Sequence, residues 1–161
     1  MKLEKPRLIA FIITAVITLI TIAFIISNSA ISKTQSAEFS NQTFGAMQGV
    51  LDWLFGKGVI NGDQFRKIAH GIEFAVLGVE ICLLYYLSYN FKFSKTIEIL
   101  GVGLAFCVLD ESVQLLSDRG AMVVDVLIDF GGICFAYLCF LAIVSVVSAI
   151  KENKTKKEKA L

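Results

Sequence analysis

Four long apolar stretches constrain the fold more than any other feature of this chain. They cover residues 8–26, 68–87, 96–116 and 122–150. About 20 apolar residues in α-helical form cross the hydrocarbon core of a bilayer, so each stretch is long enough to span a membrane. The chain of 161 residues is 56% hydrophobic and only 18% charged, whereas a soluble domain is typically about 25% charged. We therefore predict an all-α membrane protein, a single integral membrane domain with four transmembrane helices.

The basic residues predict how these helices are oriented. Lys and Arg are concentrated in residues 1–7, 88–95 and 151–161, and they are sparser in residues 27–67 and 117–121. Basic segments stay on the cytoplasmic side of a membrane, so both termini are predicted to be cytoplasmic. The basic tail of residues 151–161 is interpreted as a solvated topology signal, with contact to anionic lipids as the weaker alternative.

The first apolar stretch shares some features with a signal peptide. Its start, MKLEKPR, is positive, and the small residues Ser27 and Ser29 follow it. The apolar core of a signal peptide usually has only about 7–15 residues, and this stretch is longer. We therefore expect a retained membrane anchor and not a cleaved leader.

The loop of residues 27–67 has a helical pattern of its own. Trp53 lies within this pattern, and an amphipathic helix with a tryptophan is typical of the membrane interface. We predict a short extracytoplasmic interfacial helix between the first and second transmembrane helices, and a cap packed over the bundle is an equally open alternative. The apolar residues at helical spacing are Phe44, Met47, Leu51 and Leu54.

The composition argues against several other classes of site. The net charge of +1 gives no reason to expect nucleic acid as a partner. The four cysteines stand singly in apolar stretches without C-x-x-C spacing. They are therefore interpreted as packing residues, and neither a zinc site nor a disulfide framework is favoured.

Carboxyl groups nevertheless occur inside three of the four apolar stretches. At 1.5 Å per residue of helix, Glu73, Asp110, Glu111 and Asp125 lie about 5–9 Å below the extracytoplasmic ends of their helices, and Asp129 lies deeper. A charged group at membrane depth costs about 2.5–3.5 kcal/mol or more, so these groups must be paired, protonated, hydrated or bound to a cation. The sequence therefore predicts a polar site between helices, near the extracytoplasmic face.

Helical spacing places the polar residues of each helix on one stripe. The short turn of residues 117–121 makes the third and fourth helices antiparallel neighbours, and Arg119 in that turn lies over the same level. The pairs that share a helix face are His70 with Glu73, Asp110 with Gln114, and Asp125 with Asp129.

Two segments, RKIAHGIEFAVLG and LDESVQLLSDRGAMVVDVLIDFGG, together resemble the VanZ-like family of small bacterial membrane proteins over about residues 63–145. The family pattern is K-x-x-H-x-x-E at a helix start, D-E-x-x-Q at a helix end, an arginine in the next turn, and D-x-x-x-[DN] in the last helix. The resemblance implies a protein of the bacterial cell membrane and envelope, and the family takes its name from resistance to the glycopeptide teicoplanin. It implies no particular reaction. The matching positions are Lys67, His70, Glu73, Asp110, Glu111, Gln114, Arg119, Asp125 and Asp129.

An enzyme that modifies a lipid-linked or anionic envelope component is the first function hypothesis. Arg119 and Lys67 would bind the anionic group, since a guanidinium forms bidentate hydrogen bonds with phosphate or carboxylate. A cation such as Mg²⁺ or Mn²⁺ would suit carboxylate oxygens and phosphate chemistry, and the residues leave open whether a metal binds. The catalytic site would comprise His70, Glu73, Asp110, Glu111, Gln114, Asp125 and Asp129.

Two other hypotheses stay open beside the enzyme. A non-catalytic binding or accessory protein would hold a lipid headgroup, a peptide or a glycopeptide in the same cavity. A carrier would use intramembrane carboxyl groups, including that of Glu80, but four helices without an internal repeat make a poor transporter. Membrane lipids are partners in every case, and the oligomeric state is left open.

Overall fold

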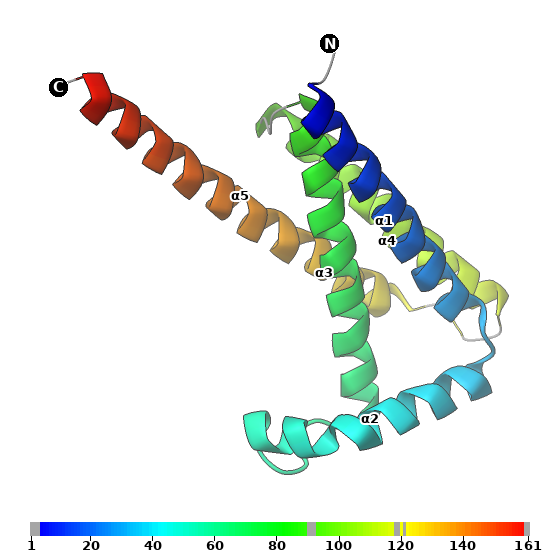
Figure 1. Cartoon of the computed structure of the whole chain (residues 1–161). Coiled ribbons are helices and arrows are strands. Elements are labelled where there is room, and N and C mark those ends of the chain that lie inside the picture. Colours follow the sequence, from blue (N-terminus) through cyan, green and yellow to red (C-terminus); the bar gives the residue numbers. More distant parts are fainter. Residues whose placement is uncertain (1–3, 90–92, 118–119, 121, 160–161) are drawn as a thin grey trace.

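The computed structural model describes residues 4–89, 93–117, 120 and 122–159, and the regular secondary structure of this part of the chain consists of helices joined by short turns (Figure 1). Four of its helices are long and apolar enough to cross a membrane, which confirms the predicted all-helical fold with four candidate spans. The helices are α1 (Lys5–Ala30), α2 (Lys33–Phe55), α3 (Gly62–Tyr89), the short 3₁₀ helix η1 (Phe93–Lys95), α4 (Thr96–Leu116) and α5 (Val123–Lys159).

Three of the helices extend further than the predicted spans. The predicted boundaries followed the apolar residues, whereas a helix continues until its backbone is capped or broken. At the start of α3, Asn61 Oδ1 accepts a hydrogen bond from Gln64 N at 2.9 Å, and Gln64 Oε1 accepts one from Asn61 N at 3.0 Å. This reciprocal cap begins the helix six residues before the predicted span at residue 68. The predicted tail of residues 151–161 is helical as far as Lys159.

Helix α2 crosses the end of the bundle at which α3 begins (Figure 1). Its range, Lys33–Phe55, is longer than the short helix that the apolar pattern predicted. Phe44 packs against Phe65 of α3 with ring centroids 5.6 Å apart. Trp53, however, is 81% exposed, so the far end of α2 does not cover the bundle. Its location at the membrane interface stays a prediction.

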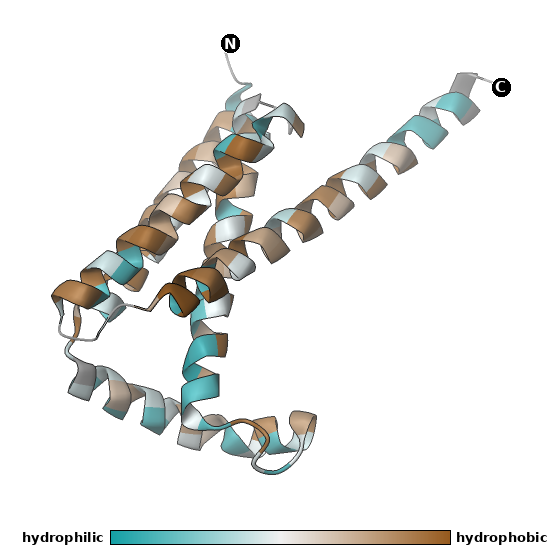
Figure 2. Cartoon of the chain, turned by 180° about the vertical axis from the view of Figure 1, so that it is seen from behind, coloured by the Kyte–Doolittle hydropathy of each residue, from teal (hydrophilic) through white to brown (hydrophobic). Residues whose placement is uncertain are grey.

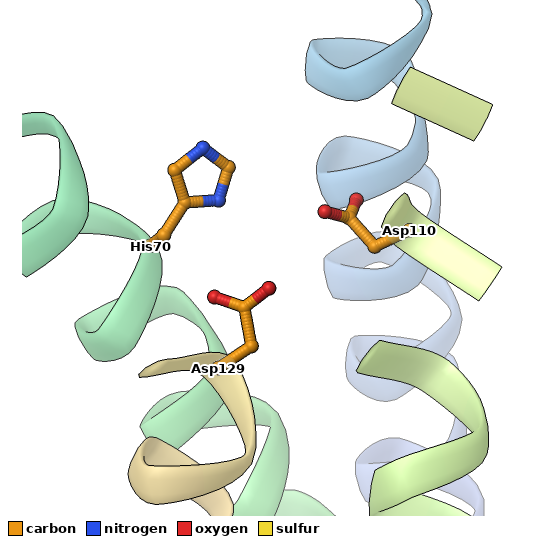
Figure 3. A group of neighbouring side chains, drawn as sticks. All are labelled: His70, Asp110 and Asp129. Carbon is orange, nitrogen blue, oxygen red and sulfur yellow. The ribbon is translucent and has the colours of Figure 1, made fainter. Parts of the chain in front are cut away.

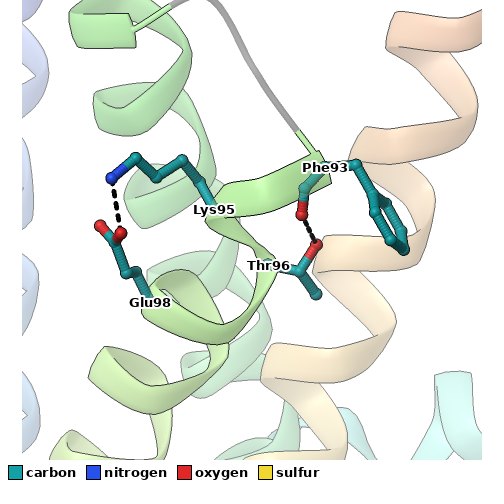
Figure 4. Close-up of polar contacts among 4 residues, drawn as sticks. All are labelled: Phe93, Lys95, Thr96 and Glu98. Atoms are coloured by element: carbon teal, nitrogen blue, oxygen red, sulfur yellow. Dashed lines mark hydrogen bonds and ion pairs between the residues drawn. The ribbon is translucent and has the colours of Figure 1, made fainter.

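At the opposite end of the bundle, polar contacts begin α4 (Figure 4). Thr96 Oγ1 donates a hydrogen bond to the carbonyl oxygen of Phe93 at 2.6 Å. Lys95 Nζ and Glu98 Oε1 form an ion pair at 2.5 Å on the exposed surface of the helix. Glu98 therefore has an ordinary surface role, far from the carboxyl groups at the other end of α4.

Helices α3 and α5 make the closest backbone contact in the bundle. A Cβ atom at Gly132 would lie 2.2 Å from the carbonyl oxygen of Gly71 and 3.0 Å from the amide nitrogen of Ala75. Small residues allow such an approach between membrane helices. Beside this contact, Phe74, Leu77 and Ile133 belong to the buried apolar core. We refer to the backbone contact of Gly71 with Gly132 as the glycine contact.

Beyond the glycine contact, α5 diverges from the other three long helices (Figure 1). This part of α5 carries exposed apolar side chains as far as Ile150, and in Figure 2 its ribbon is mostly coloured as hydrophobic before the hydrophilic C-terminal end. Such a surface is stable in lipid and not in water. The beginning of α1 and the end of α5 lie on the same side of the bundle, away from α2 (Figure 1). A chain with four membrane spans has its two ends on the same side of the membrane, and the positions of the two helix ends agree with this.

Substitutions at two adjacent glycines test the glycine contact. Gly132→Ala forces α3 and α5 apart, because the added Cβ meets backbone atoms that cannot rotate away, and we expect it to lower the free energy of unfolding by about 2–3 kcal/mol or more. Gly131→Ala is the matched control, since a Cβ there meets nothing within 4 Å. It should be neutral or stabilise by up to about 1 kcal/mol. Equilibrium unfolding in mixed micelles measures both, and equal stabilities would contradict the contact.

Candidate functional site

Three side chains from three helices point toward one another at the α2 end of the bundle (Figure 3). They are His70 on α3, Asp110 on α4 and Asp129 on α5, and each offers a ligand-type atom within 4.8 Å of those of the other two. Asp110 and Asp129 are each only 1% exposed, and His70 is partly buried. The helices thus bring together three of the residues that the sequence assigned to the polar site, including Asp129, which it placed deeper than the other carboxyl groups. The chemical roles of the three residues stay predictions. We call these three residues the central cluster.

Hydrogen bonds from two helices fix the carboxyl group of Asp110. Gln114 Nε2 donates to Asp110 Oδ2 at 2.7 Å, one helical turn along α4. Ser29 Oγ, from the end of α1, donates to Asp110 Oδ1. Ser29 is itself 1% exposed, so this bond lies in the protein interior. Asp110 is therefore held in one orientation by α1 and α4 together.

The carboxyl group of Asp129, unlike that of Asp110, is not fixed by hydrogen bonds from described residues. Among the described residues, neither of its oxygens has a hydrogen-bond partner, although both are buried. One oxygen of Asp125, one turn earlier on α5, is likewise buried without a described partner. Buried polar atoms are rarely left without a partner. The site therefore calls for a further polar group or ion beside Asp129.

Glu111 lies outside the central cluster and connects two helices. Its Oε1 accepts a hydrogen bond from the backbone N–H of Met122 at 2.5 Å, across the turn from α4 to α5. Glu111 is 5% exposed. Its clearest role in the structure is to hold the beginning of α5 against the end of α4. Arg119, predicted to bind substrate from this turn, lies outside the described residues.

A cavity of about 160 Å³ lies beside the cluster, between the end of α1, the first half of α2 and the beginning of α3. His70 and Glu73 line it, so α3 presents both of its predicted catalytic residues to this space. Phe39 and Phe65 form part of its apolar wall, and Arg66 is its basic residue. We call this space the α2 cavity.

A second, much smaller recess separates the α2 cavity from α5. Its volume of about 10 Å³ leaves room for about one water molecule. Two basic residues near the start of α3 and two carboxyl groups near the start of α5 reach it. The residues lining it are Arg66, Lys67, His70, Asp125, Ile128 and Asp129.

Two residues of the site were not predicted from the sequence. Arg66 has a signal in the sequence, because it precedes His70 by one helical turn and lies on the same face of α3. Ser29 has no such signal, because it follows the first apolar stretch and lies beyond the predicted end of that span. Only the structure places its hydroxyl beside Asp110.

Removing one hydroxyl tests the link from α1 to the site. Ser29→Ala takes away a buried donor to Asp110, and we expect it to lower the free energy of unfolding by about 1–2 kcal/mol. Ser27→Ala is the matched control, because Ser27 is exposed and its Oγ donates only to Ala23 O of its own helix. Unfolding in mixed micelles measures both variants. An equal loss in both would show that Ser29 does not support Asp110.

Comparison with known proteins places the chain in a family. The model of the VanZ/LLP1 family matches residues 9–145, which confirms the resemblance found over residues 63–145 and extends it back through α1. No curated protein and no solved structure matches the chain. With four candidate spans and a family match over most of its length, this chain is a multi-pass membrane protein that belongs to the VanZ/LLP1 family.

Proposed function

We propose that this protein binds an anionic, lipid-linked component of the bacterial cell envelope in the α2 cavity and modifies it chemically there. The observation that carries the proposal is the lining of that cavity. One space is lined by a guanidinium, an imidazole, a carboxyl group and aromatic walls. This combination suits a ligand with a charged headgroup and an apolar body.

Arg66 is the group that binds the anion in this proposal. Among the described residues the ion pairs are Lys95–Glu98 and Lys156–Glu152, so the guanidinium of Arg66 is not engaged by a described carboxylate. A guanidinium presents five donors in a planar fork that matches phosphate or carboxylate. Lys67, predicted to bind substrate, lines the adjacent recess and adds positive charge to the same region.

His70 and Glu73 are the acid–base groups in this proposal. They are one helical turn apart on α3, and both line the cavity that receives the ligand. A positioned imidazole or carboxyl group typically contributes about 10²–10⁴-fold to a reaction that moves a proton. Asp110, Asp125 and Asp129 lie behind them and shape the field around the reacting group.

A carrier function has less support from the geometry. Glu80, on which a carrier would depend, is buried and accepts a hydrogen bond from Thr21 Oγ1 of α1 at 2.8 Å. The buried apolar residues Phe74 and Leu77 lie between Glu80 and the cavity residues along α3. A relay through the membrane needs polar groups at that level.

The proposed function requires α2 and its cavity to face the outside of the cell. We propose that orientation from the basic residues of the helix ends, and cysteine labelling tests it. Lys57→Cys, in the exposed turn after α2, should react with a membrane-impermeant maleimide in intact cells. Lys154→Cys, near the exposed end of α5, should react only after the cells are opened. The reverse pattern would place the site on the cytoplasmic face.

The family takes its name from teicoplanin resistance, so we propose that the activity in the α2 cavity protects the cell against this glycopeptide. The susceptibility of a sensitive Gram-positive host that expresses the chain tests this function. We expect protection by the wild type, and loss of most of it with Glu73→Gln, which preserves the shape of the side chain but removes its proton chemistry. Arg66→Ala should also lose protection, because the anion loses its main partner. Glu98→Gln is the matched control at equal membrane levels, since Glu98 is exposed at the opposite end of α4.

The variants also separate turnover from binding alone. Full protection with Glu73→Gln but not with Arg66→Ala would favour a non-catalytic binding protein. Full protection with both variants would contradict any role of the α2 cavity. A wild type that gives no protection would remove the resistance role, and the ligand would then be sought among extracted envelope lipids that bind the wild type but not Arg66→Ala.

A further inference from the structure

We propose that His70, Asp110 and Asp129 form a binding site for one divalent cation of the Zn²⁺ or Mn²⁺ class. Their ligand-type atoms lie within 4.8 Å of one another and come from three different helices. Figure 3 shows all three side chains directed toward the space between them.

The spacing of the three side chains suits a single ion. Donor atoms that bind one cation at about 2.1 Å are separated from one another by roughly 3–4 Å. The separations within the cluster are at most 4.8 Å. Small rotations of the side chains therefore close the set around an ion, with no movement of the helices.

Asp129 supplies an independent sign that an ion belongs here. It is 1% exposed, both of its oxygens lack a hydrogen-bond partner among the described residues, and it points into the cluster. A carboxylate removed from water without a partner is strongly destabilised. A divalent cation gives both the missing partner and the balancing charge.

The surroundings hold the ligands in place, as they do in metal sites. Gln114 and Ser29 each donate to one oxygen of Asp110, which orients the carboxylate and leaves it able to bind an ion. The glycine contact brings α5, and Asp129 with it, against the turn of α3 that carries His70. Such supporting contacts orient metal ligands and tune their affinity.

The ligand types favour one group of metals. Mg²⁺ and Ca²⁺ prefer oxygen ligands alone, and the sequence had pointed to a hard cation such as Mg²⁺ because it emphasised carboxylates. The cluster pairs an imidazole with two carboxyl groups. Zn²⁺ is commonly bound by imidazole together with carboxylate, with an open position left for water or substrate. Mn²⁺ accepts carboxylates well and provides a paramagnetic probe.

The ion deepens the function proposed above, and its role in that function rests on the proposal. With the imidazole of His70 bound to the ion, Glu73 is the acid–base group of the α2 cavity. Among the described residues, five carboxyl groups lie in or near the site, from Glu73, Asp110, Glu111, Asp125 and Asp129, and two basic side chains reach it, from Arg66 and Lys67. An anionic ligand would be repelled by this balance of charge. A bound divalent cation reduces the negative charge and can polarise the ligand directly.

Metal binding by the purified full-length chain in nanodiscs tests the site without any assay of turnover. The cation is removed with a chelator, and the protein is titrated separately with Zn²⁺, Mn²⁺ and Mg²⁺. We expect one Zn²⁺ or Mn²⁺ per chain and at least tenfold weaker binding of Mg²⁺. Electron spin-echo spectra of bound Mn²⁺ should show coupling to one imidazole nitrogen, which His70→Gln removes.

Two ligand variants and one control complete the test. Asp129→Asn and His70→Gln should each weaken binding by at least about tenfold, whereas Glu98→Gln should bind as the wild type does. Unchanged binding in both ligand variants, no stoichiometric binding in the wild type, or binding of Mg²⁺ equal to that of Zn²⁺ would each overturn the proposal. If Asp129→Asn does not fold, the affinity of His70→Gln for the ion and the loss of the imidazole nitrogen coupling in that variant still test the site.

Failure of the metal site and failure of the proposed function are distinguishable. Binding of the ion without any loss of protection in Glu73→Gln and Arg66→Ala would leave the metal site standing and remove the function. Loss of protection in those variants, together with no stoichiometric binding of the ion by the wild type, would support the function and overturn the metal site. The two results are independent because neither substitution removes a ligand of the cluster.

Discussion

The backbone contact between Gly71 and Gly132 is the constraint on which the rest of the structure depends. Lipid gives membrane helices no hydrophobic reason to associate, so close van der Waals packing must hold them together. Here the missing side chain of Gly132 lets α5 touch the backbone of α3 at Gly71 and Ala75. That contact lies one residue after His70 and three residues after Asp129. The packing that stabilises the bundle is therefore also the packing that assembles its polar site.

The chemistry of the site follows from where that packing occurs. Carboxyl groups in lipid are costly unless they find partners, and the carboxyl groups of this site differ in the partners they have. Asp110 has hydrogen bonds from α1 and α4, and Glu111 has the backbone of Met122. Neither oxygen of Asp129 has a hydrogen-bond partner among the described residues. Asp129 is therefore the carboxyl group of the central cluster that most needs a further partner.

The sequence predicted the four spans and the common level of the polar residues, because hydropathy and a rise of 1.5 Å per residue determine both. It also predicted the Asp110–Gln114 face, which the structure shows as a hydrogen bond. It did not predict which helices touch. Gly132 and Ser29 contact residues far away in the chain, and spacing within one helix carries no information about those neighbours. The length of α2 was likewise missed, since its first half is too polar to show an apolar pattern.

The link from Ser29 to Asp110 has a consequence for how the chain enters the membrane. Its helices emerge from the ribosome in order, so α1 is already in place when α4 arrives with its buried acids. Ser29 is then available as a partner at the depth that Asp110 must occupy. Asp129 comes last, on α5, and only its arrival completes the central cluster. The polar centre of this protein is thus assembled in stages during membrane insertion, with the least satisfied carboxyl group added at the end.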